Sequence, residues 1–428
     1  MSAAQPSRPL YDVRGSQASN HLDMLRGIAA IAVLVCHAKI LFFGTVADDA
    51  QATVFRRGLD MLGRYGHSAV IVFFVLSGFF ISGSIIRDVA ERRWSWRKYL
   101  VNRASRLYVV LVPGLLLTLA WDQAGMAFLG QSPPPAAPAA EEIVSANQIR
   151  EHTTVGALAG NLLFLQTIAT PTFGSNGSLW SLANEWWYYI LFPCLWLAWQ
   201  RTASWSARAG YLALAAGVAW MVGTEIASYF AIWLMGTAIC LLPRCPWLAG
   251  PRASRTASWL AAAPLLLMLA AIGMHWLNHG RLRDGMLGLT FASLIYCLLH
   301  RVEPDRGGRY ARLAQCLAGF SYTLYVVHFP VLAFAWVLWT YQAPWPADLL
   351  HVFYVSGILA TVLAYAYALS RLTETQTDHV RRFLMRPQIV FGSRAAPAMG
   401  AVPTPHPSPL ATAPLAPASS PVVSGQQQ

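Results

Sequence analysis

Long apolar stretches, separated by short charged loops, dominate the pattern of hydrophobic and polar positions along this chain. A helix needs about 20 mostly apolar residues to cross a bilayer, so the pattern predicts about ten transmembrane helices. We place them at residues 24–43, 68–87, 107–129, 179–199, 207–223, 226–243, 257–277, 285–300, 316–340 and 348–370. The fifth and sixth stretches lie close enough to merge. The apolar segment 155–170 is shorter and is expected to be re-entrant or interfacial.

The charges in the loops predict how these helices are oriented. Residues 87–106 contain seven Arg or Lys residues, and positively charged loops stay in the cytoplasm. Successive helices cross the membrane in alternate directions. With ten helices and this loop in the cytoplasm, both termini are expected on the cytoplasmic side. Two loops on the opposite side disagree with the rule, because they carry Arg56, Arg57 and Arg64, and Arg281 and Arg283.

Composition supports the same class. Apolar residues make up 56% of the 428 residues and charged residues 12%, whereas soluble domains are about 25% charged. The net charge of +12 is explained by the basic loops rather than by nucleic-acid binding. The six cysteines form no CxxC pair, so no metal site is expected. The sequence therefore predicts an all-α polytopic integral membrane protein.

Three regions follow from this pattern. Residues 1–20 are expected to be an N-terminal cytoplasmic segment, and residues 21–375 the transmembrane domain. Residues 376–428 are expected to form a cytoplasmic tail. From about Gly392 the tail is rich in Pro, Ala and Ser and lacks an apolar period, so it is predicted to be disordered.

Two ionisable residues, Arg26 and His37, lie in the first apolar stretch. At about 100° per residue, eleven steps return to within roughly 20° of the start, so both side chains leave the same helix face. Ionisable groups are costly inside a bilayer and usually mark a functional site. The alternative interpretation is an arginine at the membrane edge and a packed core histidine.

Two further stripes of polar side chains, at steps of three and four residues, place ionisable groups at a similar depth. Ser178, Ser181 and Glu185 form the first stripe, and Ser321, Tyr325 and His328 form the second. At 1.5 Å rise per residue, His37, Glu185 and His328 all lie about 20 Å above the inner edge. We expect a proton-handling site there, since a neutral histidine can act as a general base. His328 alone is equally consistent with a packed core histidine.

Arg103 and Arg106 lie three residues apart at the start of the third predicted helix, near the same inner edge as Arg26. A cluster of guanidinium groups suits phosphate recognition, because each presents a fork of donors. The alternative is that Arg103 and Arg106 are only topology charges.

Five segments of the chain together resemble the membrane O-acyltransferases of acyltransferase family 3, the O-antigen and exopolysaccharide acetylase type. They are residues 22–37, 72–82, 103–108, 178–189 and 321–330. The family's Arg-ten-residues-His motif falls on Arg26 and His37, and its Arg-x-x-Arg motif on Arg103 and Arg106. Ile71 stands where many relatives have Asp. Some relatives also append an SGNH esterase-like domain, whereas here the Pro-, Ala- and Ser-rich tail follows.

The resemblance implies a multi-pass protein of the cell inner (plasma) membrane. It also implies transfer of an acyl group, usually acetyl, from cytoplasmic acyl-CoA to a carbohydrate hydroxyl beyond that membrane. On this interpretation, Arg26, Arg103 and Arg106 hold the CoA phosphates. His37 deprotonates the acceptor or briefly carries the acyl group, and Glu185 orients His37 or stabilises its cation. The residues Ser321, Tyr325 and His328 line the acyl or sugar path.

Two other classes of protein remain open at this stage. A proton-coupled transporter of sugars or small molecules also needs ionisable residues near the midplane, although the sequence shows no duplicated halves. A membrane scaffold is the third class, and it predicts that His37 and Glu185 are dispensable. The expected partners are a carbohydrate or glycoconjugate acceptor and membrane lipids, and the sequence does not identify the acceptor.

Overall fold

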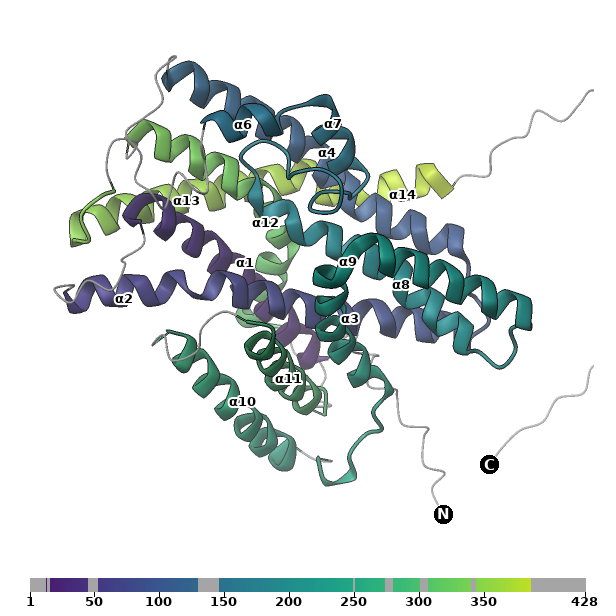
Figure 1. Cartoon of the computed structure of the whole chain (residues 1–428). Coiled ribbons are helices and arrows are strands. Elements are labelled where there is room, and N and C mark those ends of the chain that lie inside the picture. The colour runs from purple at the N-terminus through teal and green to yellow at the C-terminus, as the bar shows by residue number, and fades with distance from the viewer. Residues whose placement is uncertain are drawn as a thin grey trace, which may run out of the picture. The chain divides into compact units, whose positions relative to one another are not determined.

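A computed structural model describes residues 13, 16–44, 53–129, 146–248, 251–273, 280–300, 307–339 and 344–385 (Figure 1). Within this part of the chain, the secondary structure consists of helices and contains no strand. Most of the predicted N-terminal segment and the predicted disorder beyond Gly392 lie outside the described residues.

The longer helices follow the predicted apolar stretches. They are α1 (Gln17–Phe43), α3 (Tyr65–Ala90), α4 (Trp96–Leu129), α8 (Trp180–Trp199), α9 (Trp205–Leu241), α10 (Pro251–Gly273), α11 (Arg281–Leu298), α12 (Arg309–Trp339) and α13 (Leu349–Leu372). The shorter helices are α2 (Val54–Gly63), α6 (Ala146–His152), α7 (Val155–Leu162) and α14 (Thr377–Met385), with the 3-10 turns η1 (Gly177–Leu179), η2 (Pro246–Leu248) and η3 (Glu374–Gln376).

Seven helices in the described residues are long and apolar enough to cross a membrane. Four of them are α1, α4, α9 and α12, one is formed by α2 with α3, one by α13 with α14, and one lies in α10. The chain is therefore a multi-pass membrane protein. The helix α8, which is rich in Trp and Tyr, and α11, which carries three charged residues, match predicted stretches but are not among the seven. The count of ten and the orientation of the termini stay predictions.

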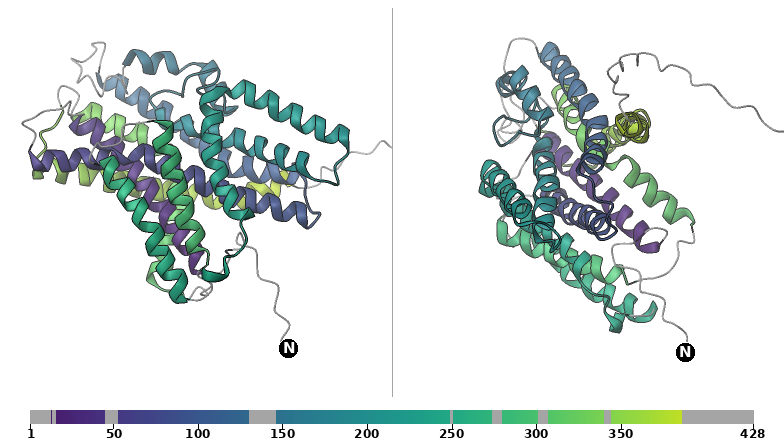
Figure 2. Two further views of the ribbon diagram at one scale, coloured as in Figure 1. Left: turned by 60° about the horizontal axis from the view of Figure 1, so that its bottom comes forward. Right: turned by 90° about the vertical axis from the view of Figure 1, so that its right-hand side faces the viewer.

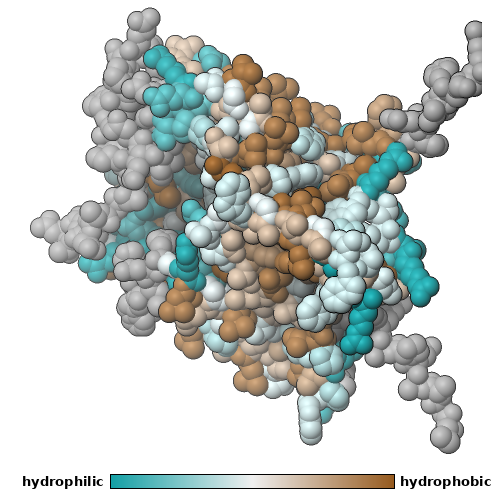
Figure 3. Space-filling view, turned by 45° about the vertical axis from the view of Figure 1, so that its right-hand side comes forward, coloured by the Kyte–Doolittle hydropathy of each residue, from teal (hydrophilic) through white to brown (hydrophobic). Residues whose placement is uncertain are grey.

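The exposed surface agrees with a lipid environment. Large apolar side chains such as Leu116, Trp220 and Phe353 are mostly exposed. Figure 3 shows hydrophobic side chains over much of the visible face, with hydrophilic residues toward its right edge and upper left. Such extensive apolar exposure is unusual for a soluble monomer, so this surface suits contact with lipid.

The fifth and sixth predicted stretches correspond to the two helical segments of α9, which meet at a kink at Gly223. Gly223 interrupts α9 with φ 75° and ψ 177°, a left-handed backbone conformation that glycine adopts without steric cost. Figures 1 and 2 show that the two halves of α9 run in different directions. The second half crosses α3 closely, because a Cβ atom on Gly78 or on Gly236 would overlap the backbone of the other helix. Small residues allow such close helix packing in membranes.

Two prolines inside helices leave carbonyl groups that other parts of the chain satisfy. A proline removes the hydrogen bond to the carbonyl four residues earlier. For Pro193 in α8 that carbonyl belongs to Tyr189, and the Tyr99 hydroxyl donates to it at 3.0 Å. For Pro330 in α12 it belongs to Val326. The Tyr99 contact ties α4 to α8 beside the functional site described below.

The Val326 carbonyl receives its hydrogen bond from the side chain of Asn176, at 2.8 Å. Asn176 is fully buried, also donates to Thr118 Oγ1 at 3.2 Å, and accepts from the Ser178 hydroxyl at 2.6 Å. Asn176-Gly177-Ser178 matches a glycosylation sequon, but the buried amide is used to hold the start of α8 against α4 and α12. Its role in the structure is packing.

Candidate functional site

Five helices, α1, α3, α4, α8 and α12, surround a cavity of about 300 Å³. Its wall is apolar along α3, where Val70, Phe73 and Phe80 contribute. The rest of the wall carries three arginines, one carboxylate and several hydroxyl groups. An apolar pocket with a few convergent polar groups is typical of a ligand site.

The three arginines singled out in the sequence meet at this cavity. Arg26 lies 3.6 Å from Asp23, and its guanidinium lies 5.1 Å from the centre of the Phe80 ring. Arg103 lies over the Tyr99 ring at 5.8 Å, and its buried Nε has no hydrogen-bond partner. Arg106 is exposed on the same wall. The structure thus places these arginines of α1 and α4 on the wall of one cavity, and their role in binding a donor stays a prediction.

Glu185 lies on the wall of the same cavity. Its Oε1 accepts hydrogen bonds from the Ser77 hydroxyl at 3.0 Å and from the Tyr189 hydroxyl at 2.5 Å. It also interacts electrostatically with Arg26. A carboxylate inside a membrane needs such partners, because an isolated charge there is costly.

His37 pairs with His328 and not with Glu185. The Nδ1 atom of His37 lies 2.8 Å from the Nε2 atom of His328, and the two rings stack with centres 5.1 Å apart. Neither ring belongs to the residues that line the cavity. The expected contact between Glu185 and His37 is therefore corrected. Equal depth says nothing about the direction in which a side chain leaves its helix, and Glu185 bonds to Ser77 on α3 and to Tyr189 on its own helix.

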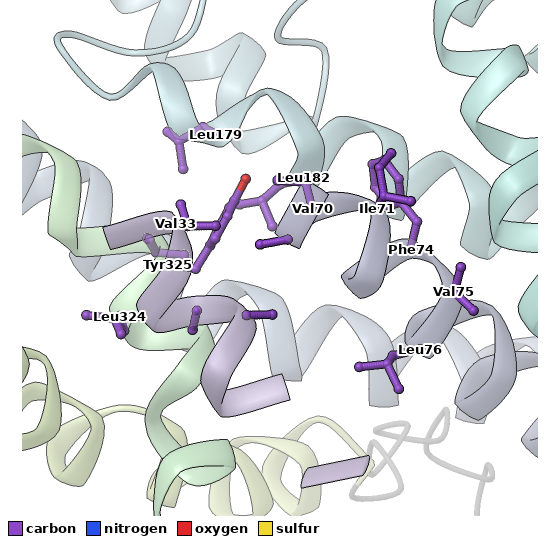
Figure 4. Close-up of a cluster of buried hydrophobic side chains, with 14 of the residues drawn as sticks. Val33, Val70, Ile71, Phe74, Val75, Leu76, Leu179, Leu182, Leu324 and Tyr325 are labelled. Carbon is purple, nitrogen blue, oxygen red and sulfur yellow. The ribbon is translucent and has the colours of Figure 1, made fainter. Parts of the chain in front are cut away.

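The three polar residues predicted on α12 lie partly at the cavity and partly at the histidine pair. Ser321 and Tyr325 line the cavity, and the Tyr325 ring also lies 6.1 Å from the His328 ring. The Tyr325 hydroxyl donates to the Ser178 carbonyl at 2.8 Å and bonds to the Ser181 hydroxyl at 2.6 Å. Figure 4 shows this hydroxyl pointing toward the start of α8. Tyr325 thus borders the cavity on one side and the histidine pair on the other.

Three site residues escaped the sequence analysis. Tyr189 lies four residues after Glu185 on α8 and was therefore detectable by helical spacing. Ser77 is a single small hydroxyl in an apolar run and gives little signal. Glu374 accepts from the Thr323 backbone N–H at 2.8 Å and its hydroxyl at 2.6 Å, and it interacts electrostatically with Arg26 and Arg106. No pattern in the sequence connects Glu374 with the arginines.

The position at which many relatives carry Asp is part of the hydrophobic core in this chain. Ile71 is fully buried on α3 and packs in the hydrophobic cluster of Figure 4. Among the described residues, no group of three or more His, Cys, Asp or Glu side chains is arranged to hold a metal ion. The chemistry that the described site supports is therefore that of arginines, hydroxyl groups, one carboxylate and two histidines.

Comparison with known proteins identifies the family. The sequence profile described as an acyltransferase domain, that of acyltransferase family 3, matches residues 20–369. The chain belongs to this family and is a membrane-bound acyltransferase. The matched range includes both arginine motifs, the histidine pair and Glu185. No curated protein and no solved structure matches the chain.

Proposed function

We propose that this acyltransferase moves an acetyl group from acetyl-CoA in the cytoplasm to a hydroxyl of a carbohydrate or glycoconjugate. The acceptor is taken from the opposite side of the inner (plasma) membrane. Membership of the family supports acyl transfer over the alternative of a proton-coupled transporter. The choice of acetyl and of a carbohydrate acceptor rests on the resemblance of the sequence motifs.

The observation that carries the donor assignment is the meeting of Arg26, Arg103 and Arg106 at one cavity. The Nε of Arg103 is buried without a partner, and leaving such a donor unpaired is costly. A phosphate oxygen supplies the missing acceptor, and guanidinium groups bind phosphate through paired hydrogen bonds. CoA is a donor with phosphates at one end and a thioester at the other.

The size of the cavity indicates which part of CoA it takes. Ligand pockets usually have volumes of about 300–1,000 Å³, and this one is at the lower end with about 300 Å³. It suits the slender pantetheine arm and a small acyl group, with the nucleotide at the mouth beside the exposed Arg106. Glu185 and Tyr189 then face the polar amides of that arm, and the Ser77 hydroxyl donates to Glu185.

The proposed chemistry uses His37 as the general base. The acceptor oxygen attacks the thioester carbonyl while its proton passes to the His37 ring. The carbon–sulfur bond then breaks, and the proton returns to the sulfur to release CoA with a free thiol. Tyr325 lines the cavity and its ring lies 6.1 Å from that of His328, the partner of His37, so on this proposal the thioester passes Tyr325 to reach His37. We propose that Ser321, Tyr325 and His328 line this path.

The test is direct. Purified protein in lipid nanodiscs, supplied with acetyl-CoA and an extract of cell-surface glycans, is expected to release free CoA thiol only when the glycans are present. Mass spectrometry of surface glycans from cells with and without the gene is expected to show acetyl groups that depend on the gene. Uptake of a sugar without release of CoA would instead support the transporter.

A further inference from the structure

The hydrogen bonds of His328 determine which of its ring nitrogens carries a proton. Its Nδ1 lies 2.9 Å from the Leu324 carbonyl oxygen and 2.9 Å from the Tyr325 carbonyl oxygen. Carbonyl oxygens only accept hydrogen bonds, so Nδ1 must be the donor and must carry the proton. This contact is local to α12, because the two carbonyls belong to residues three and four positions earlier.

The same argument extends to His37. His328 is 1% exposed, and among the described residues no carboxylate forms a hydrogen bond with either ring. A cation on the buried His328 ring without such a partner is costly. His37 is half-buried and packs against the rings of His328 and Phe329, so a cation there meets a similar cost, and both rings are neutral. His328 then has a bare Nε2, which accepts a hydrogen bond from Nδ1–H of His37 at 2.8 Å. The lone pair of His37 is therefore on Nε2.

Neighbouring contacts hold this arrangement in place. The turn of α12 that supplies the two carbonyls is anchored by Asn176, which donates to the Val326 carbonyl, and by Tyr325, whose hydroxyl bonds to Ser178 and Ser181. The Phe329 ring, on the same helix, packs against His37 in a T-shaped contact with ring centres 5.0 Å apart. The His328 ring is thus fixed on a packed helix.

We propose that His328 is a positioning residue, which holds His37 in the tautomer whose Nε2 takes the proton of the acceptor hydroxyl. This inference rests on the proposed role of His37 as the base. When Nε2 takes the proton, Nδ1–H stays in place and its bond to His328 stabilises the new positive charge. His328 does for His37 what the aspartate of a serine-protease triad does for its histidine, without a charge of its own.

The experiment compares two substitutions of His328 in protein labelled with ¹⁵N-histidine and held in nanodiscs. In His328→Gln, the side-chain oxygen can still accept from Nδ1–H of His37. In His328→Leu, the packing volume is largely kept and the acceptor is lost. Nitrogen NMR distinguishes a protonated from a bare ring nitrogen, and the His37 signals are identified by their absence in His37→Asn.

His300 provides an internal reference for the spectra. Its Nδ1 lies 2.8 Å from the Tyr296 carbonyl oxygen, and its Nε2 accepts the backbone N–H of Cys245 at 2.9 Å. Both contacts select the same tautomer as that inferred for His37. The His300 signals are expected to be identical in all variants, which shows that the fold is retained.

We expect His37 to be protonated at Nδ1 and bare at Nε2 in the unaltered protein and in His328→Gln. In His328→Leu, we expect protonation to shift toward Nε2, with acyl transfer lowered roughly 10²–10⁴-fold, the range of general-base catalysis, and donor affinity unchanged. His328→Gln is expected to keep transfer within about tenfold of the unaltered protein, a change of about 1.4 kcal/mol.

The proposal is overturned if His37 in the unaltered protein is protonated at Nε2. It is also overturned if His328→Leu keeps the Nδ1 tautomer. The spectrum of the unaltered protein needs no substrate. It therefore decides the tautomer of His37 even if His328→Leu folds poorly or if the assays detect no transfer. Absence of transfer in the unaltered protein would count against the proposed function and leave the spectral result standing.

Discussion

Arg26 and His37 leave the same face of α1 but border different parts of the site. Arg26 lines the cavity, whereas His37 does not line it and bonds to His328. Tyr325 lies against both parts, since it lines the cavity and its ring is 6.1 Å from that of His328. A helix carrying a phosphate-binding group and a base three turns apart suits an enzyme whose two substrates approach from opposite sides.

His37→Ala is expected to lower acyl transfer by at least roughly 10²–10⁴-fold, because a methyl group cannot accept the proton of the acceptor. Expression and membrane insertion are expected to persist. The measurement is release of CoA thiol by purified protein. His351→Ala is the matched control, because His351 bonds to Asp348 at the start of α13, away from the site. Near-normal turnover of folded His37→Ala would contradict the proposed chemistry.

Arg103→Lys and Arg106→Lys are each expected to weaken CoA binding about tenfold, or about 1.4 kcal/mol. Lysine keeps the charge but loses the paired donors of the guanidinium. Titration calorimetry with CoA measures the effect.

The controls for the arginine prediction are Arg92→Lys and Arg93→Lys, in the loop before α4. Arg93 is paired with Asp88 and Glu91, and neither control residue lines the cavity. Both are expected to bind CoA normally. If all four variants behave alike, Arg103 and Arg106 act only as topology charges.

Glu185→Gln is expected to tighten CoA binding about fivefold. Its carboxylate shares the cavity with three arginines. At an effective dielectric constant near 20, one negative charge acting on a bound phosphate roughly 16 Å away contributes about 1 kcal/mol of repulsion, which the substitution removes. The amide oxygen of Gln can still accept from Ser77 and Tyr189, so the wall should keep its shape. Calorimetry on CoA again provides the measurement.

Ser77→Ala is the control for Glu185→Gln, because it removes one hydrogen bond to the carboxylate but keeps the charge. We expect it to leave CoA affinity within about twofold, well under 1 kcal/mol. Loss of turnover in Glu185→Gln with unchanged CoA affinity would argue for a direct action of Glu185 on the acyl-transfer step.

Asn176→Asp is expected to destabilise the protein by about 1–3 kcal/mol, the cost of leaving a buried polar group unsatisfied. A carboxylate cannot donate to the Val326 carbonyl, which lacks a helical partner because of Pro330. The apparent melting temperature in detergent is the measurement. Asn102→Asp, at a partly exposed position on α4, serves as the control. Equal melting temperatures for the two variants would show that the buried amide has no special role.

Much of the molecule follows from the sequence because hydrophobic period and charge act locally. The apolar stretches predicted the long helices, including the break between the fifth and sixth stretches, which the structure places at Gly223 within α9. Helical spacing placed Arg103 beside Arg106 and put Arg26 and His37 on one face. These relations depend only on the rise and turn of a single helix, and they needed no knowledge of neighbouring helices.

The tertiary structure decided which side chains meet. Sequence spacing gives depth along a helix but not its rotation against a neighbour, which is set by close packing such as that of Gly78 with Gly236. For this reason Glu185 meets Ser77 and Tyr189 rather than His37, and His37 meets His328 from a helix almost 300 residues away. The tautomer of that histidine pair depends on contacts between helices, and so only the folded chain determines it.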